Sequence, residues 1–283
     1  DSDVFEWSGV EDLVPILNPN GTAPAIDTVT DPRFVIRRYR PRIDSLYARI
    51  ERWTTIDGTD THWRSLSRDN ILTIYGGDAD SRIAAPDGRV FSWLISQTRD
   101  DRGNAIIYSY RRDDAAGVDI GAAHQSSRGP IADERRATNR YLKRIRYGNR
   151  VPLLDAAGKR PATITGDAIA NAKWMFELVV DYGDHNTAAP TPNHNQPCTH
   201  RRDAYSTYTP GFEVRTTRLC RRFLMFHHFP GAADVGHNCL VSSTDLTHTV
   251  GDTGYALLTS VTHTGYRRDG AGYQSRSLQP VEY

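Results

Sequence analysis

Residues 211–229 constrain the fold more than any other part of this chain. The last eighteen of them contain neither Gly nor Pro, and a Pro-Gly pair stands at each end of the stretch. Such pairs mark turns. From Phe212 to Thr217, apolar and polar residues alternate, which indicates a strand with one buried face. The chain must therefore accommodate an unusually long uninterrupted strand.

The alternation changes phase after Arg218, where the apolar residues move to odd positions. One extra residue, a bulge near Thr217 or Arg218, would exchange the two faces in this way. If all eighteen residues are extended, the strand is about 60 Å long at ~3.3 Å per residue. Most strands have only about five or six residues. A helix from Leu219 to Phe229 is the competing interpretation, because apolar residues also recur there at helical spacing.

The rest of the chain is a series of strand-like runs separated by turns rich in Gly, Asn, Asp and Pro. Their spacing of about ten to fifteen residues in the first third is typical of an antiparallel meander. A short helix is expected within 133–139 and a loop over 187–202. The predicted strands cover 4–7, 13–17, 34–39, 48–53, 62–66, 70–75, 90–95, 105–110, 141–147, 174–182, 239–243 and 256–263.

These patterns predict an all-β, mainly antiparallel fold with a long-stranded meandering sheet and little helix. The 283 residues are enough to bury about three quarters of the unfolded surface without disulfides or metals. We expect a single domain over 1–283, because no stretch separates two cores. The chain begins at Asp1 rather than Met, so we expect a fragment or a processed chain.

Charge and hydropathy exclude some classes of function. The net charge of +1 gives no general attraction to nucleic acid or to membrane surfaces. No apolar run approaches the ~20 residues of a membrane-spanning helix. We therefore expect no nucleic-acid partner and no membrane-spanning segment.

A metal site is the first chemical hypothesis to weigh. His194, Cys198 and His200 lie close together in the sequence, and His237 with Cys239 could complete a zinc site. Their spacing matches no standard zinc finger, so polar loop residues are the favoured interpretation. The three cysteines form no C-x-x-C motif and allow at most one disulfide.

His227 and His228 form the second candidate site. Adjacent residues of a strand point to opposite faces, so the two rings cannot serve one site without a bulge. We expect structural roles, with aromatic-like packing and one hydrogen-bonded ring.

Nucleophile and phosphate-binding motifs are absent from the sequence. There is no G-x-S-x-G, H-E-x-x-H, G-x-x-x-x-G-K or G-x-G-x-x-G. We therefore predict no catalytic residue, no cofactor-binding residue, no metal ligand and no cofactor. An enzyme, and a binding module that uses the aromatic-rich strands, remain the alternatives to a structural protein.

Several long and unusual strings follow the order seen in one known family. They include Asp3-Val4-Phe5, Ser8 to Pro15, Arg38 to Ile43, His62 to Ser65, Asn139 to Ile145 and residues 211–229. On these residues the chain resembles the SpvB-type N-terminal domain, which is shared by a Salmonella virulence protein and the B component of insecticidal toxin complexes. The resemblance covers nearly the whole chain. The family's usual Gly-rich, Trp-containing opening is missing, which agrees with a fragment.

The resemblance implies a non-catalytic structural module of a secreted bacterial toxin. In such proteins, long strands related to RHS repeats form part of a hollow shell that encloses a separate toxin domain and helps to deliver it. The implied partners are a C-type RHS subunit and an A-type pore subunit. The alternatives are a fragment associated with an ADP-ribosyltransferase, although this chain contains no E-x-E motif, and a protein- or glycan-binding β module.

We predict that the isolated chain self-associates. A piece of a larger sheet presents unpaired backbone groups along its outer strands, and such edges pair with other chains. Sedimentation velocity across a concentration series measures this directly. A single monomeric species at high concentration would contradict an incomplete sheet.

Overall fold

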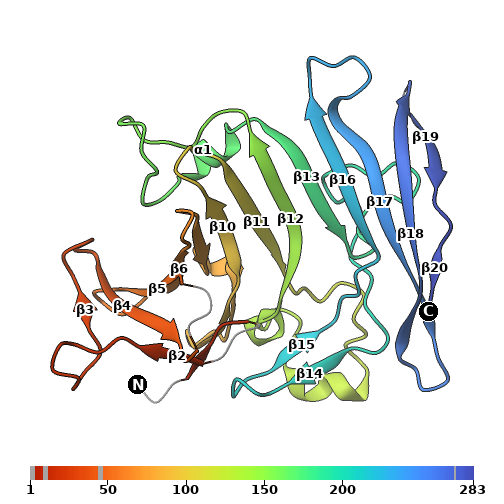
Figure 1. Ribbon diagram of the computed structural model, residues 1–283. Coiled ribbons are helices and arrows are strands. Elements are labelled where there is room, and N and C mark those ends of the chain that lie inside the picture. The colour runs from red at the N-terminus through yellow and green to blue at the C-terminus, as the bar shows by residue number, and fades with distance from the viewer. Residues whose placement is uncertain (1–3, 9–11, 44–46, 271) are drawn as a thin grey trace. The chain divides into compact units, whose positions relative to one another are not determined.

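The computed structural model describes residues 4–8, 12–43, 47–270 and 272–283 (Figure 1). Asp3 and Gly9-Val10-Glu11, which contribute to the family resemblance, lie outside the described residues. Antiparallel strands make up nearly all the regular structure. The helical elements of the described residues are short: α1 (Gly166–Ala170) and 3-10 turns at Ala79–Ser81, Ala123–Arg128 and Glu134–Ala137. The last of these is the short helix expected within 133–139.

The chain folds into two compact units, each assembled from three segments. One unit comprises Asp1–Arg82, Ser92–Ile106 and Pro152–Ile169, and the other comprises Ile83–Phe91, Ile107–Val151 and Ala170–Tyr283. The chain passes between the units repeatedly, so no single linker separates them. The single domain expected over 1–283 stays a prediction.

The first unit is a meander of antiparallel strands in the order β1-β2-β4-β5-β6-β7-β10, with β3 paired to β4. The expected run over 90–95 divides into β9, which pairs with β8, and the start of β10, a strand that the sequence did not indicate. The other predicted strands of this unit are confirmed. The bounds are β1 (Phe5–Glu6), β2 (Asp12–Pro15), β3 (Ile26–Asp27), β4 (Phe34–Pro41), β5 (Arg49–Thr55), β6 (Thr61–Leu66), β7 (Leu72–Tyr75) and β10 (Ile95–Arg99). The β8 (Arg82–Ala84) and β9 (Val90–Trp93) pair contains residues of both units.

Aromatic residues on alternate strand positions form the core of the first unit. Tyr39 and Trp63 are buried with ring centroids 4.9 Å apart, and Phe5 lies edge-on to Trp63 at 5.0 Å. Trp93 completes the cluster and donates from its indole to the carbonyl of Thr61 at 2.8 Å. Edge-to-face contacts of this kind stabilise a sheet beyond the area that they bury.

The second unit contains the longer strands. Their order is β11-β12-β13-β16-β17-β18-β19, with β20 on β18. The strands β17 and β18 run for 15 and 14 residues, well beyond the runs that the sequence indicated. Figure 1 shows these strands side by side. The bounds are β11 (Ala105–Arg112), β12 (Arg140–Asn149), β13 (Trp174–Asp181), β16 (Arg222–Phe229), β17 (Gly236–Val250), β18 (Ala256–Asp269), β19 (Gly272–Ser277) and β20 (Val281–Glu282).

The single long strand expected over residues 212–229 is wrong. The structure has β15 (Val214–Thr216), which pairs with β14 (Tyr205–Thr207) in a separate two-stranded sheet, and then β16. The five residues between β15 and β16 belong to no strand, so neither a bulge near Arg218 nor a helix from Leu219 explains the change of phase. Figure 1 shows the β14–β15 pair apart from β16.

Buried polar contacts of Arg218 account for the break. Its side chain is almost fully buried and donates to the carbonyls of Ala116 (2.9 Å), Cys198 (3.3 Å) and Asp114 (2.8 Å), and also to the Asp114 carboxylate. The preceding amide, that of Thr217, donates to the Tyr141 hydroxyl at 2.8 Å instead of to a neighbouring strand. These partners end the strand pairing at this point.

The loop over 187–202 is confirmed, since residues 182–204 contain no strand or helix. A buried ionic network holds its first turn. Asp184 is fully buried, accepts from the Lys143 ammonium at 2.8 and 2.9 Å and pairs with the Arg111 guanidinium at 2.8 Å. The N-terminal end of the loop is therefore held against β11 and β12.

We predict that Arg218→Met destabilises the fold by about 3 kcal/mol, because it leaves the carbonyls of Ala116, Cys198 and Asp114 without their donor and removes the cation beside two carboxylates. Arg267→Met, at an exposed position of β18, is the matched control and should change stability by less than about 0.5 kcal/mol. Urea unfolding followed by Trp fluorescence measures both. Equal midpoints for the two variants would contradict the role of Arg218.

Asp113, beside Arg218, gives a pH-dependent prediction. Burial raises the pKa of its carboxyl to about 6 despite the Thr217 hydrogen bond and the Arg218 charge. In the unfolded chain an Asp ionises near pH 4, so between about pH 4 and 6 the folded state retains a proton that the unfolded state has lost. Stability therefore falls as pH rises through this window.

Relative to Asp113→Asn, we expect the natural chain to lose about 2 to 3 kcal/mol of unfolding free energy from pH 4 to pH 7. Urea unfolding of both proteins across this range is the measurement. Parallel pH profiles would show that Asp113 does not titrate in the folded state.

Candidate functional site

The strongest candidate for a functional site is a surface rather than a catalytic centre. The register places Tyr147 opposite Phe176, and Phe176 opposite His227, across β12, β13 and β16. Residues directly opposite one another share a face of the sheet, as do those two positions along each strand. The partly exposed residues of this surface are here called the apolar face, and Val180, opposite Phe223, lies on the same side but is buried. The apolar face comprises Ile145, Tyr147, Phe176, Leu178, Phe223, Met225, His227 and Phe229.

Ring contacts confirm the register of the apolar face. Phe176 stacks on Tyr147 at 5.1 Å and meets His227 edge-on at 5.0 Å and Phe229 at 5.7 Å. Gly148 has a φ of 67°, and a Cβ there would lie 2.7 Å from the Phe176 ring. Gly148 therefore leaves the room that Phe176 needs to lie across the end of β12.

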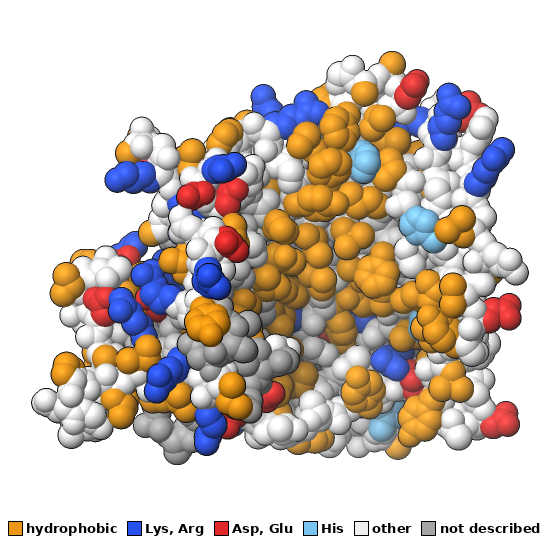
Figure 2. Space-filling view, viewed as in Figure 1, with side chains coloured by type: hydrophobic (Ala, Val, Ile, Leu, Met, Phe, Trp, Pro, Cys, Tyr) orange, Lys and Arg blue, Asp and Glu red, His pale blue; other side chains and the backbone are white. Residues whose placement is uncertain are grey.

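The members of the apolar face are only partly buried, and Phe223 is 36% exposed. Figure 2 shows apolar side chains gathered over β13 and β16 with a histidine among them. Contiguous apolar patches of this kind mark interaction sites in soluble proteins. The surface can therefore bury further apolar area against a partner.

The opposite face of the same strands is more deeply buried, although it carries the charges. Val179, Leu224, Phe226 and Leu240 are essentially inaccessible and pack with tyrosines from β18 and β19. Among them, Glu177 contacts Arg144 at 2.8 Å. The charged residues of these strands thus lie among apolar residues on the more buried face, and the open face is apolar as well.

Glu177 also fixes His228. The His228 Nδ1 accepts from the Asn238 amide at 3.2 Å, so its Nε2 carries a proton and donates to the Glu177 carboxylate at 3.0 Å. Burial disfavours the ionised Glu177, but the His228 hydrogen bond and the Arg144 charge outweigh it and lower the Glu177 pKa. The carboxylate is therefore a stable, paired anion at neutral pH.

The two adjacent histidines have the structural roles that the sequence predicted. His227 packs between Phe176 and Phe229 on the apolar face, whereas His228 bonds to Glu177. The rings therefore meet different groups, and no shared site forms.

The zinc candidates do not form a ligand set. His194 is exposed, whereas Cys198 is buried against Val180 and Tyr182. His200 is half-buried, and its Nε2 has no hydrogen-bond partner. Across the described residues, no group of three His, Cys, Asp or Glu side chains could hold a metal ion. Cys198, Cys220 and Cys239 are free thiols, so no disulfide forms.

Sequence reasoning missed the apolar face as a site. It identified a strand over 174–182, but an alternating strand does not reveal which of its faces is left open. The available signal is that apolar residues of β12, β13 and β16 coincide once the three strands are aligned in antiparallel register.

No helix within the described ranges is long and apolar enough to cross a membrane.

Fold and surface together define a class: an antiparallel β module with an open apolar face on its sheet. A family model described as Salmonella virulence plasmid 65kDa B protein (SpvB) matches residues 1–229. The chain belongs to this family. The mono(ADP-ribosyl)transferase SpvB of Salmonella typhimurium is 32% identical over 249 residues, which cover 83% of this chain and 40% of that protein.

Solved structures agree with this assignment. The N-terminal domain of effector protein SpvB from Salmonella typhimurium strain LT2 matches with a TM-score of 0.75 and 27% identity, over all of this chain and 82% of that one. The TcdB2-TccC3-Cdc42 structure matches with a TM-score of 0.79 and 26% identity, over all of this chain and 13% of that one. These similarities confirm the predicted resemblance and the all-β fold class.

Proposed function

We propose that this chain is a non-catalytic structural module of a secreted bacterial toxin, forming part of a shell that encapsulates a separate toxin domain and helps to deliver it. The apolar face is the observation that carries the proposal. A wall that holds another polypeptide needs a broad surface of modest, unspecific affinity, and half-exposed aromatic and aliphatic residues supply it.

The distribution of charge over β12, β13 and β16, with charged residues on the buried face and an apolar open face, supports the same function. The charges are neutralised within the protein, as in the Glu177–Arg144 and Arg222–Asp181 pairs, the latter at 2.6 Å. The apolar side is left open at the cost of exposing area that an isolated protein would bury. This arrangement is favourable where the open side faces a bound chain.

Comparison with related proteins supports a structural rather than an enzymatic role. The chain matches the N-terminal domain of SpvB and spans 40% of the length of the transferase. We infer that transferase activity belongs to another part of that relative. The chain also matches the TcdB2-TccC3-Cdc42 structure and a structure of the Photorhabdus luminescens Tc holotoxin pore. These matches support toxin-complex subunits as partners, a C-type RHS subunit and an A-type pore subunit.

We predict that the chain binds an unfolded polypeptide and not its folded form. Reduced, carboxymethylated α-lactalbumin is the unfolded probe and native α-lactalbumin is the folded one, with binding measured by fluorescence anisotropy. Phe223→Asp should weaken binding by roughly tenfold, since a buried Phe contributes about 1.5–3 kcal/mol. The substitution also places a charge within the apolar contact, which adds to the loss of binding.

Phe91→Asp is the matched control. Phe91 is more exposed than Phe223 (45% against 36%) and lies outside the apolar face. We expect it to bind like the natural chain. Equal weakening by both substitutions, or equal affinity for native and unfolded α-lactalbumin, would count against an encapsulating wall.

A further inference from the structure

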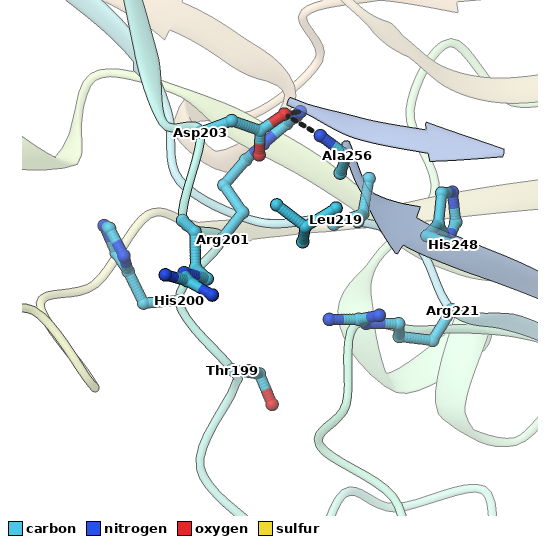
Figure 3. A pocket seen from close by; sticks show the side chains of 10 residues that line it. Thr199, His200, Arg201, Asp203, Leu219, Arg221, His248 and Ala256 are labelled. Carbon is cyan, nitrogen blue, oxygen red and sulfur yellow. Dashed lines mark hydrogen bonds and ion pairs between the residues drawn. The ribbon is translucent and has the colours of Figure 1, made fainter. Parts of the chain in front are cut away.

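The second unit contains a cavity of about 200 Å³ (Figure 3). It lies between residues 199–203, the segment joining β15 to β16, and the adjoining ends of β17 and β18. Leu219, Val250 and Ala256 give it an apolar wall, and Arg221 and His248 give it polar groups. None of these residues belongs to the apolar face.

Among the described residues, the Arg221 guanidinium has no counter-ion. No hydrogen bond or ion pair engages it from the described part of the chain. Its backbone is fixed, because its amide donates to the Asp181 carbonyl and its carbonyl accepts from the Leu246 amide, both at 2.8 Å. The backbone therefore holds the planar, charged guanidinium of Arg221 at the cavity. Its N–H donors are arranged to bind an oxyanion through two hydrogen bonds.

His248 lies beside Arg221. The β17–β18 register shifts between Thr247 and His248, and such bulges redirect side chains. The His248 Nδ1 is buried and has no partner. Figure 3 shows Arg221 and His248 on one side of the cavity and His200 on the other. An arginine and a histidine thus line the same side of the cavity.

Asp203 does not neutralise this site. Of the lining residues that the structure describes, it alone carries a carboxylate. That carboxylate accepts from Arg201 Nε at 2.8 Å and Nη2 at 2.7 Å, and from the Ala256 amide at 2.9 Å. These bonds occupy both oxygens of the Asp203 carboxylate, and the bond from Ala256 also holds residues 201–203 against β18. The cavity consequently keeps positive charge without a free acceptor.

We propose that this cavity binds a small organic anion. Its oxyanion group, a carboxylate or a phosphate, accepts from Arg221 and His248, and its apolar body lies against Leu219 and Val250. The proposal goes beyond the structural role and uses none of the residues that carry it. Either proposal can therefore fail without the other.

The site should bind more tightly at lower pH. Burial first, and then the Arg221 charge, lower the His248 pKa, with Arg201 adding to this, whereas the Leu246 backbone and the Asp203 charge raise it. A bound anion favours protonated His248, so binding takes up a proton. Affinity therefore rises as pH falls through the His248 pKa of the complex.

Calorimetric titration of the 283-residue chain at constant ionic strength tests this. The probes are benzoate and phenyl phosphate, with benzamide as the neutral control. We expect saturable binding of an anion and none of benzamide, and the tighter anion identifies the group recognised. Benzoate keeps its charge from pH 8 to 5.5, so its affinity should rise over this range in the natural chain and stay flat in His248→Gln.

Arg221→Gln should weaken anion binding by roughly tenfold or more, as expected for loss of charge-assisted hydrogen bonds. Its backbone bonds do not involve the side chain, so the fold is retained, and an unchanged unfolding midpoint checks this. Arg267→Gln removes the same charge from an exposed position outside the cavity and should bind normally. Equal affinity of Arg221→Gln and the natural chain, benzamide binding as well as benzoate, or no saturable binding would overturn the proposal.

Discussion

The buried guanidinium of Arg218 is the interaction on which the layout of the second unit depends. It binds carbonyls and a carboxylate from two loops that are distant in sequence, through Ala116, Asp114 and Cys198. Forming these bonds requires the chain to leave strand pairing at residues 217–221. One residue thereby divides a run with strong strand propensity into β15, on a separate pair, and β16, within the main sheet. A buried charge must be compensated, so the several partners of Arg218 together fix the position of the break.

Pairing of buried charges also explains why the charged residues of β12, β13 and β16 can lie on the more buried face. Glu177 and Asp181 form ion pairs with arginines on the inner side, the same side as the buried Val179 and Leu224. Arg suits this role because its stem packs on apolar neighbours while its planar head pairs with carboxylates. Once the polar groups are satisfied internally, the outer side needs no polar residue, and an aromatic face can remain open.

Local pattern predicted the strands well and their interruptions badly. Alternation located β4, β5, β6 and β13 within a few residues, because it reflects burial on one side of a sheet. It failed over 212–229, where the deciding partners of Arg218 include residues 102 and 104 positions away. It also underestimated β17 and β18, whose Ser- and Thr-rich halves lack an apolar rhythm and are extended only because neighbouring strands pair with them. The apolar face was hidden for a related reason, since no single strand states which side is covered.

The break and the cavity are linked. A continuous strand through residues 217–221 would have paired the backbone around Leu219 with neighbouring strands and fixed Leu219 and Arg221 on one face of a sheet. Once Arg218 turns inward, the following residues are free to wall a cavity, and Arg221 is fixed there by its backbone bonds to Asp181 and Leu246. Arg221 is also the cation in this stretch without a carboxylate partner, whereas Arg218 and Arg222 each have one. Two of the three neighbouring arginines are thus neutralised, and the third lies near a half-buried histidine, which favours a ligand as the missing acceptor.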